Sequence, residues 1–401
     1  MSRPTIYVAV TNHGFGHAVR ASSVVDRIQQ LCPDVLIIMV TTAPRWLLES
    51  YIDGDFIQRQ RAFDVGVIQS DSLTMDREAT LVKLNEIRAK ENSIIASEVN
   101  FIRQNKVDLV LADIPPLAAR IAKNAGVPCW MFSNFGWDFI YRPWGGDFVE
   151  IADWIAGCFE ECDRLFRLPL HEEMSAFPNI EDVGLTGGTP RYEGEELKEY
   201  FGIKTPPEKT ITLSFGGLGL AKVPYQNVEL FPDWQFITFD TNIPEFPNLI
   251  NVKNHPIKIT PKNSPENNPS VKSKTSSSSS PLSKGGGGGI SVAKRIRPVD
   301  LMPICGRIVS KPGYSTFAEA LRLGTPIVSL SREGFAESAF LLEGIQNYSY
   351  HQILMPEVFF NGEWEFLRKP LAPPKKSEQL DKNGSEAIAR AAVKYLQSKQ
   401  Y

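Results

Sequence analysis

The sequence is poor in cysteine. Its five cysteines, Cys32, Cys129, Cys158, Cys162 and Cys305, are odd in number and scattered along the chain, so we expect no disulfide framework and a reducing, cytoplasmic setting. Cys158 and Cys162 are spaced for one helical face, yet no further thiol or histidine pair accompanies them. Buried structural cysteines are therefore expected at these positions rather than a metal site.

Long apolar runs and an excess of positive charge are also missing. No uninterrupted apolar stretch is long enough to span a bilayer, so we expect no transmembrane segment. The chain runs directly into the strand-like Thr5–Val10 without a cationic and apolar leader, which predicts no secretory signal. The formal net charge is −3, and binding to a phosphate backbone requires clustered Lys and Arg. A nucleic-acid partner is therefore not expected.

The sequence does contain a repeated alternation of apolar strands and helices. A strand at Thr5–Val10, a helix at 21–31 and a second strand at 35–40 form a βαβ unit, which predicts a parallel sheet. Residues 77–105 read as one long amphipathic helix. At 401 residues the chain exceeds what one hydrophobic core usually serves, so we expect two α/β domains.

The stretch Ser310–Pro326 predicts a loop followed by a helix. Pro312 and Gly313 form a turn after a short apolar strand, and Ser315 and Thr316 are candidate N-caps of the helix. A glycine turn that leads into a helix presents bare backbone N–H groups at the positive end of the helix dipole. This arrangement receives phosphate groups.

These residues resemble the donor-binding signature of two-domain, nucleotide-sugar-dependent glycosyltransferases. The resemblance implies that Gly313, Ser315 and Thr316 hold the diphosphate, and that Glu319 holds the ribose. Lys311 stands where plant members of the superfamily often have a histidine, and a lysine there would also face the phosphates. The nucleotide sugar is a co-substrate, and no separate cofactor is expected.

Two further segments resemble donor-binding parts of the same superfamily. Phe335 to Ser338 resembles the segment that binds the donor sugar, with Glu337 as its acidic residue and Ser338 in place of a glutamine. That replacement leaves the identity of the sugar open. Gly216 and Gly217 follow an apolar strand, and they resemble the loop that closes over the diphosphate. A plain β-turn is the alternative for these two glycines.

A histidine and an aspartate each follow a predicted strand of the first domain. His17, in a Gly-His pair, resembles the general base of inverting glycosyltransferases, and imidazole suits that task because its pKa lies near neutrality. Asp113 ends the apolar run 107–113 and is the candidate that orients the histidine, as in a catalytic triad. Alternatively, His17 caps a helix or bonds locally, and Asp113 is a strand-end turn residue.

The candidate acceptor contacts are His13 and three residues of the aromatic segment 133–141. Aromatic faces stack on sugar C–H groups and carboxylates accept from hydroxyls, so Asn134, Trp137 and Asp138 suit a sugar-facing surface. The aromatic residues fit a core equally well. His13 either lines the pocket or only packs. Two histidines without a third ligand do not make a zinc site.

Three segments extend the resemblance to most of the chain. Residues Asn12–His17, Gln69–Arg77 and Asn134–Tyr141 resemble the glycosyltransferase-like amino-terminal region of plant arabinokinases. The 401 residues correspond to that region and not to the sugar-kinase domain that follows it in the plant proteins, so the resemblance implies no kinase activity here.

The resemblance implies the GT-B architecture, in which two Rossmann-like domains with parallel sheets face a cleft. We expect an acceptor-side domain at 1–188 and a nucleotide-sugar domain at 189–401, with the linker near Thr186–Arg191. Residues 256–294 are rich in Ser, Gly, Lys, Asn and Pro, which predicts a disordered insertion in the second domain. A final amphipathic helix at 385–400 should return to the first domain.

The expected function is transfer of a sugar from a nucleotide sugar, a UDP-sugar in the first place, to a hydroxyl of a small molecule or glycan. No D-x-D motif stands on a suitable loop, so we expect metal-independent transfer with inversion at the anomeric carbon. Two other functions suit the same fold. One is a nucleotide-sugar epimerase or hydrolase, and the other is a non-catalytic sensor of nucleotide sugars.

Overall fold

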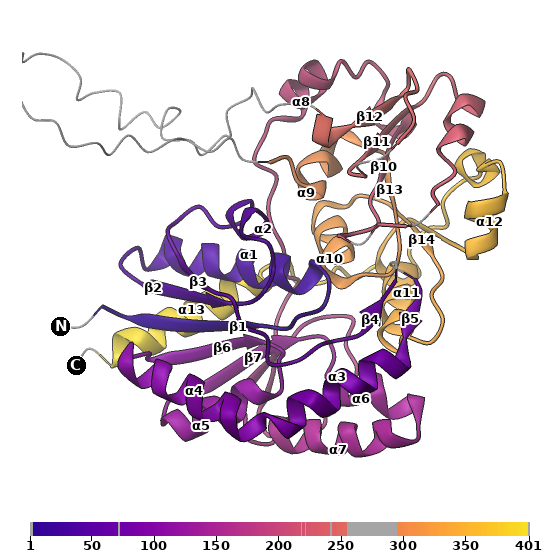
Figure 1. Cartoon of the computed structure of the whole chain (residues 1–401). Coiled ribbons are helices and arrows are strands. Elements are labelled where there is room, and N and C mark those ends of the chain that lie inside the picture. The colour runs from indigo at the N-terminus through magenta and orange to yellow at the C-terminus, as the bar shows by residue number, and fades with distance from the viewer. Residues whose placement is uncertain are drawn as a thin grey trace, which may run out of the picture.

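The computed structural model describes residues 3–70, 73–217, 219–220, 222–240, 243–254 and 295–399, and the structural statements below concern these residues. The low-complexity insertion expected at 256–294 lies outside them. The described chain forms two parallel sheets with helices packed around them (Figure 1). The α/β class and the parallel sheets predicted from the sequence are confirmed.

The first sheet has seven strands in the order β3-β2-β1-β6-β7-β8-β9, and the second has six in the order β12-β11-β10-β13-β14-β15. The first comprises β1 (Thr5–Val10), β2 (Leu36–Val40), β3 (Ile57–Arg59), β6 (Leu109–Asp113), β7 (Cys129–Ser133), β8 (Arg164–Arg167) and β9 (Ile180–Asp182). The second comprises β10 (Thr210–Leu213), β11 (Gln235–Thr238), β12 (Leu249–Asn251), β13 (Arg307–Ser310), β14 (Ile327–Leu330) and β15 (His351–Leu354). A short antiparallel hairpin joins β4 (Ile68–Gln69) and β5 (Met75–Asp76).

The α-helices of the first half are α1 (Gly16–Leu31), α2 (Arg45–Glu49), α3 (Arg77–Ala89), α4 (Glu91–Gln104), α5 (Leu117–Ala125), α6 (Trp137–Tyr141) and α7 (Asp147–Phe159). Those of the second half are α8 (Gly194–Phe201), α9 (Pro298–Leu301), α10 (Tyr314–Leu323), α11 (Glu337–Tyr348), α12 (Pro356–Asn361) and α13 (Gly384–Ser398). In the described part of the chain, no helix combines the length and the apolar character needed to cross a membrane.

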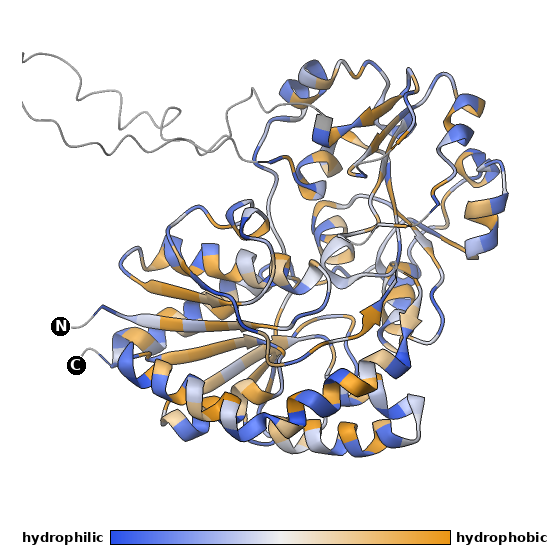
Figure 2. Cartoon of the chain, viewed as in Figure 1, coloured by the Kyte–Doolittle hydropathy of each residue, from blue (hydrophilic) through white to orange (hydrophobic). Residues whose placement is uncertain are grey.

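The alternating direction of the side chains along the central strand β1 explains why helices pack on both faces of the first sheet. Ile6 and Val8 belong to the core that contains α1 and α13, whereas Tyr7 and Ala9 belong to the core that contains α4, α5 and α7. Successive side chains of a strand point to opposite faces, so one apolar run supplies two cores. Figure 2 shows the apolar strands between helices whose outer faces are hydrophilic.

The last helix, α13, packs on α1 of the first sheet. The hydroxyl oxygens of Ser23 and Ser385 lie 3.2 Å apart, and Arg27 forms an ion pair with Glu386. The ring centroids of Trp130 and Tyr395 lie 5.3 Å apart. The first and last described elements, β1 and α13, therefore both belong to the first sheet and its helices (Figure 1).

Three predicted helices differ from those observed. The helix after β1 begins at Gly16 and not near residue 21, so His17 lies in its first turn. The single helix predicted at 77–105 is two helices that meet at Lys90, which leaves helical geometry with φ −100° and ψ 3°. Gly313 is the N-cap of α10, so Ser315 and Thr316 lie inside its first turn and are not caps.

Candidate active site

The structure brings His17 and Asp113 together at the carboxyl ends of adjacent parallel strands. Val10, the last residue of β1, is paired with Asp113 of β6, and His17 lies one short loop further on. His17 Nδ1 lies 2.8 Å from Asp113 Oδ1, and the two residues are 7% and 0% exposed. Because a carboxylate only accepts, this contact is a hydrogen bond when Nδ1 carries the ring proton, which leaves Nε2 for a substrate. Arg20 Nη2 also lies 3.0 Å from this Nδ1.

Arg20, which the sequence analysis missed, lies one helical turn after His17. Its Nε and Nη2 atoms donate to both oxygens of Asp113, at 2.6 and 2.5 Å. Burial opposes ionisation of Asp113, but the charges and hydrogen bonds of Arg20 and His17 outweigh it and hold the pKa below its ordinary value. The i, i+3 spacing of a histidine and an arginine at a helix start is the signal that would have indicated this residue.

His13 is half-buried and electrically neutral. The backbone N–H of Val67 donates to its Nδ1 at 3.1 Å, and burial, followed by the charges of His17, Lys311 and Arg332, lowers its pKa well below the ordinary value. Its ring stacks near Phe335, with centroids 5.9 Å apart. His13 therefore lies between the two sheets, beside the predicted base.

The aromatic segment belongs mostly to the core. Trp137 is 0% exposed, and its indole N–H donates to Thr11 Oγ1 at 3.0 Å, so in this structure its ring packs in the core, the alternative given for the aromatic segment. Its ring packs against the rings of His13, Phe135 and Tyr141, with centroid distances of 5.3, 5.1 and 5.6 Å. Asp138 is half-buried in the first turn of α6, where burial raises its pKa.

Asp64 is a second acid that the sequence analysis missed. It accepts from the hydroxyl of Thr11 and from the backbone N–H of Asn12. Burial raises its pKa to about 7, although the N–H of Asn12 opposes that change. No motif surrounds Asp64 in the sequence, so only the fold shows that it supports the loop before His17.

The loop between β13 and α10 faces the first sheet. Ser315 Oγ donates to the backbone oxygen of Gly16 at 2.7 Å, and a Cβ at Gly217 would lie 2.4 Å from the ring of Phe15. A Cβ at Gly216 would lie 3.8 Å from Cε of Lys311. The predicted diphosphate residues that follow β10 and β13 thus lie near one another, in contact with the segment Phe15–Gly16 that precedes His17.

Lys311 is half-buried among charged groups in this region. Burial, and then the charge of Arg332, lower its pKa to about 8, while Glu337 acts in the opposite direction. Arg332 was also missed by the sequence analysis, and its guanidinium lies 4.2 Å from the ring centroid of Phe335. Two basic side chains therefore accompany the N-terminus of α10, where Thr316 and Gly313 are partly exposed.

Glu319 and Glu337 contact protein groups in this structure. Glu319 is buried on α10, and its Oε1 accepts from the N–H of Gly188 at 2.9 Å. Burial raises its pKa to about 7, and that N–H opposes the change. Glu337, the first residue of α11, accepts from Nδ2 of Asn134 at 2.8 Å. The carboxylate of Glu319 is therefore directed toward the segment that joins the two sheets.

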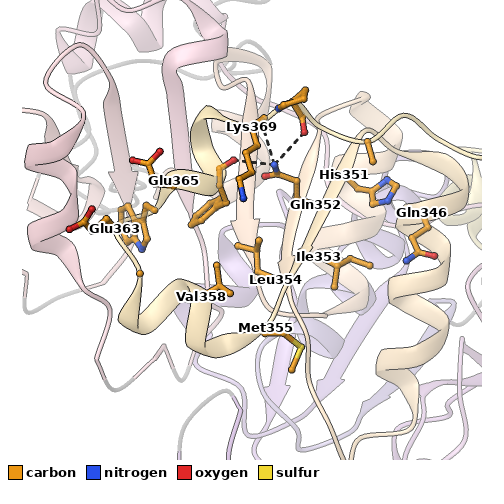
Figure 3. A pocket seen from close by; sticks show the side chains of 15 residues that line it. Gln346, His351, Gln352, Ile353, Leu354, Met355, Val358, Glu363, Glu365 and Lys369 are labelled. Carbon is orange, nitrogen blue, oxygen red and sulfur yellow. Dashed lines mark hydrogen bonds between the residues drawn. The ribbon is translucent and has the colours of Figure 1, made fainter.

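Two grooves lie near the surface. One of about 850 Å³ is bordered by the β4–β5 hairpin and by Glu333 and Gly334, just before Glu337. The other, of about 750 Å³, follows β15, α12 and the 3-10 turn Glu365–Arg368, and Gln352 reaches the backbone of Lys369 beside it (Figure 3). None of the predicted site residues lines either groove. Within the described ranges, no three His, Cys, Asp or Glu side chains gather in a possible metal site.

A search of known proteins finds one curated relative. L-arabinokinase of Arabidopsis thaliana is 28% identical over 387 residues, which cover 95% of this chain and 33% of that protein. The chain thus spans about a third of the relative's length, and the matched part is its amino-terminal region, as the sequence motifs indicated. No protein-family model matches the chain.

Solved structures with a similar fold are glycosyltransferases of the two-domain type. UGT71G1 of Medicago truncatula, complexed with UDP-glucose, matches with a TM-score of 0.54 and 12% identity, over 98% of this chain and 94% of that one. A UDP-glucose:anthocyanidin 3-O-glucosyltransferase in complex with UDP matches with a TM-score of 0.57 and 9% identity, over 100% and 94%. The predicted GT-B fold is therefore confirmed.

Proposed function

We propose that this chain is a glycosyltransferase that moves a sugar from a nucleotide sugar, a UDP-sugar in the first place, to an acceptor hydroxyl. The observation that carries the proposal is the buried His17–Asp113 pair, which lies in contact with the loop at the start of α10 through Gly16 and Ser315. A base and an anion-binding helix start are what sugar transfer from a nucleotide diphosphate requires.

His17 would act as the general base. Asp113 holds the Nδ1 proton, so Nε2 takes the proton of the acceptor hydroxyl. The acceptor oxygen then forms a bond to the anomeric carbon as the bond from that carbon to the diphosphate breaks. The diphosphate leaves with the electron pair, and the proton stays on His17. Because the attack comes from the face opposite the leaving group, the configuration at the anomeric carbon inverts.

The departing diphosphate would lie at the N-terminus of α10. Backbone N–H groups after Gly313, the hydroxyl of Thr316 and the ammonium group of Lys311 are the stabilising groups, in a site that needs no divalent cation. With a pKa of about 8, Lys311 is largely protonated at neutral pH. Addition of EDTA is therefore expected to leave the rate of transfer unchanged.

Binding of nucleotides tests the donor site directly. Thermal unfolding of the purified protein would be followed with UDP, ADP, GDP and TDP and with UDP-glucose, because a ligand of the folded state raises the unfolding temperature. We expect stabilisation by UDP and UDP-glucose that is lost in Lys311→Met and reduced in Thr316→Val. No stabilisation by any nucleotide contradicts the proposal. Release of UDP from UDP-glucose without an acceptor would indicate a hydrolase instead.

A further inference from the structure

Five buried side chains form a continuous hydrogen-bonded chain from the first sheet to the second. His17 contacts Asp113, Asp113 contacts Arg20, Arg20 Nη1 donates to Asn134 Oδ1 at 2.8 Å, and Asn134 Nδ2 donates to Glu337 Oε1 at 2.8 Å. The five residues are between 0% and 7% exposed. The predicted base is thereby linked to the predicted donor-sugar residue.

Arg20 makes the orientation of this chain unambiguous. A guanidinium group only donates, so the atom of Asn134 that faces it is the amide oxygen. The amide nitrogen of Asn134 consequently faces Glu337, whose carboxylate accepts. Both ends of the amide therefore have protein partners in this structure. Asn134 joins the guanidinium group of Arg20 on α1 to the carboxylate of Glu337 on α11.

Arg20 also fixes Asp113 in place. Its fork covers both carboxylate oxygens, and its guanidinium lies 5.1 Å from the ring centroid of Tyr314 in the first turn of α10. An aspartate held at both oxygens has one position from which to accept the proton of His17 Nδ1. A displacement of Arg20 therefore changes the direction in which Nε2 points.

From this geometry we propose that Arg20 and Asn134 are positioning residues that transmit the placement of Glu337 to His17. The inference rests on the proposed function. A donor sugar whose hydroxyls bind Glu337 sets the position of that carboxylate, and Asn134 and Arg20 pass it on to Asp113. The base is then correctly aimed when the donor is bound, so deprotonation of the acceptor follows donor binding.

His13 lies beside His17, and the groups that act on His13 stay constant in the test. The ring of His13 lies 6.1 Å from that of His17, and Lys311 and Arg332 act on His13 from the second sheet. None of these is part of the hydrogen-bonded chain. Asn134→Leu and Arg20→Lys are therefore the informative variants, because the first removes the link at similar volume and the second keeps the charge but loses the fork.

The first test is a separation of kcat from KM with UDP-glucose as donor. For Asn134→Leu and for Arg20→Lys we expect kcat to fall about 10- to 100-fold, with KM for UDP-glucose within threefold of the original. The kcat of the double variant should be no lower than that of the poorer single variant, because the two substitutions interrupt the same hydrogen-bonded chain. Additive losses, or a change in KM alone, would overturn the inference.

A second measurement needs no variant and does not depend on turnover. In the original protein, the ¹⁵N and ¹H signals of the His17 ring are recorded with UDP and with UDP-glucose. The inference predicts a change with UDP-glucose that UDP, which lacks the sugar, does not produce. Equal changes with both ligands overturn the inference but leave the donor site intact. Binding of neither ligand overturns the proposed function and the inference together.

Discussion

The hydroxyl of Ser315 donates a hydrogen bond to the backbone oxygen of Gly16 at 2.7 Å, which joins the start of α10 to the start of α1. The predicted phosphate loop is therefore in direct contact with Gly16, the residue before the predicted base. Ser315 is buried, whereas Thr316 next to it is partly exposed. The two neighbouring hydroxyls should consequently have different roles.

Replacement of each hydroxyl separately tests this difference. Ser315→Ala removes the hydrogen bond between α10 and α1. It should lower the free energy of unfolding by about 1 kcal/mol, with little effect on UDP affinity. Thr316→Val keeps the shape of the side chain but loses a donor to phosphate, so UDP affinity should fall roughly tenfold. Calorimetric titration with UDP, combined with chemical denaturation, measures both. A tenfold loss of affinity in Ser315→Ala alone would reverse the assignment.

Gly66 determines where His13 lies. Its φ is +58°, and a Cβ added there would be 2.4 Å from Cβ of His13. We expect Gly66→Ala to lower the free energy of unfolding by about 2 kcal/mol and to displace His13 from its position between the two sheets.

Gly202→Ala is the matched control for that variant. Gly202 has a φ of +68°, but a Cβ there would meet nothing within 4 Å. Gly202→Ala should therefore lower the free energy of unfolding by about 1 kcal/mol, which is the cost of the positive φ alone. If denaturant unfolding shows equal losses for the two variants, the contact with His13 has no energetic effect.

The raised pKa of Glu319 predicts that the stability of the protein depends on pH. Its pKa is raised from 4.5 to about 7 by burial, so between these values the folded protein binds a proton that the unfolded chain releases. Stability therefore falls as pH rises through this window. Glu319→Gln keeps an oxygen for the N–H of Gly188 and does not titrate. At pH 8 it should be more stable than the original protein by about 3 kcal/mol, and the advantage should vanish toward pH 4.5.

Unfolding by denaturant at several pH values checks this expectation. Asp64, with a raised pKa of its own, contributes a slope of the same sign that remains in the variant. Glu199→Gln, at an exposed position of α8, serves as the control and should show no such advantage. An unchanged pH profile in Glu319→Gln would mean that Glu319 is ionised in the folded protein at neutral pH.

The strands were predictable from the sequence because they are short, buried and bounded by turn residues. Thr5–Val10 was expected with the bounds observed. The helix start at Gly16 was missed because Gly14 and Gly16 indicate a loop by composition, whereas packing against the sheet stabilises the first turn. The break at Lys90 was missed since no proline or glycine marks it.

The candidate site was predictable only in part. His17 and Asp113 could be paired because each follows a strand of one parallel sheet. The partners of Asn134 and Glu319 could not be inferred, since Glu337 and Gly188 are distant in sequence and belong to other elements. Trp137 illustrates a further limit: an aromatic ring beside polar residues suits a sugar surface and a core equally well, and only the fold shows that this ring is enclosed.

The most direct measurement of the central claim is the release of UDP from UDP-sugars in the presence of a panel of hydroxyl acceptors, for the original protein and for His17→Gln. The account predicts acceptor-dependent release that falls about 10²- to 10⁴-fold in His17→Gln, while calorimetric affinity for UDP stays unchanged. Release that is undiminished in His17→Gln would contradict the role of His17 as the base. Failure of the original protein to bind UDP at all would contradict the transferase itself.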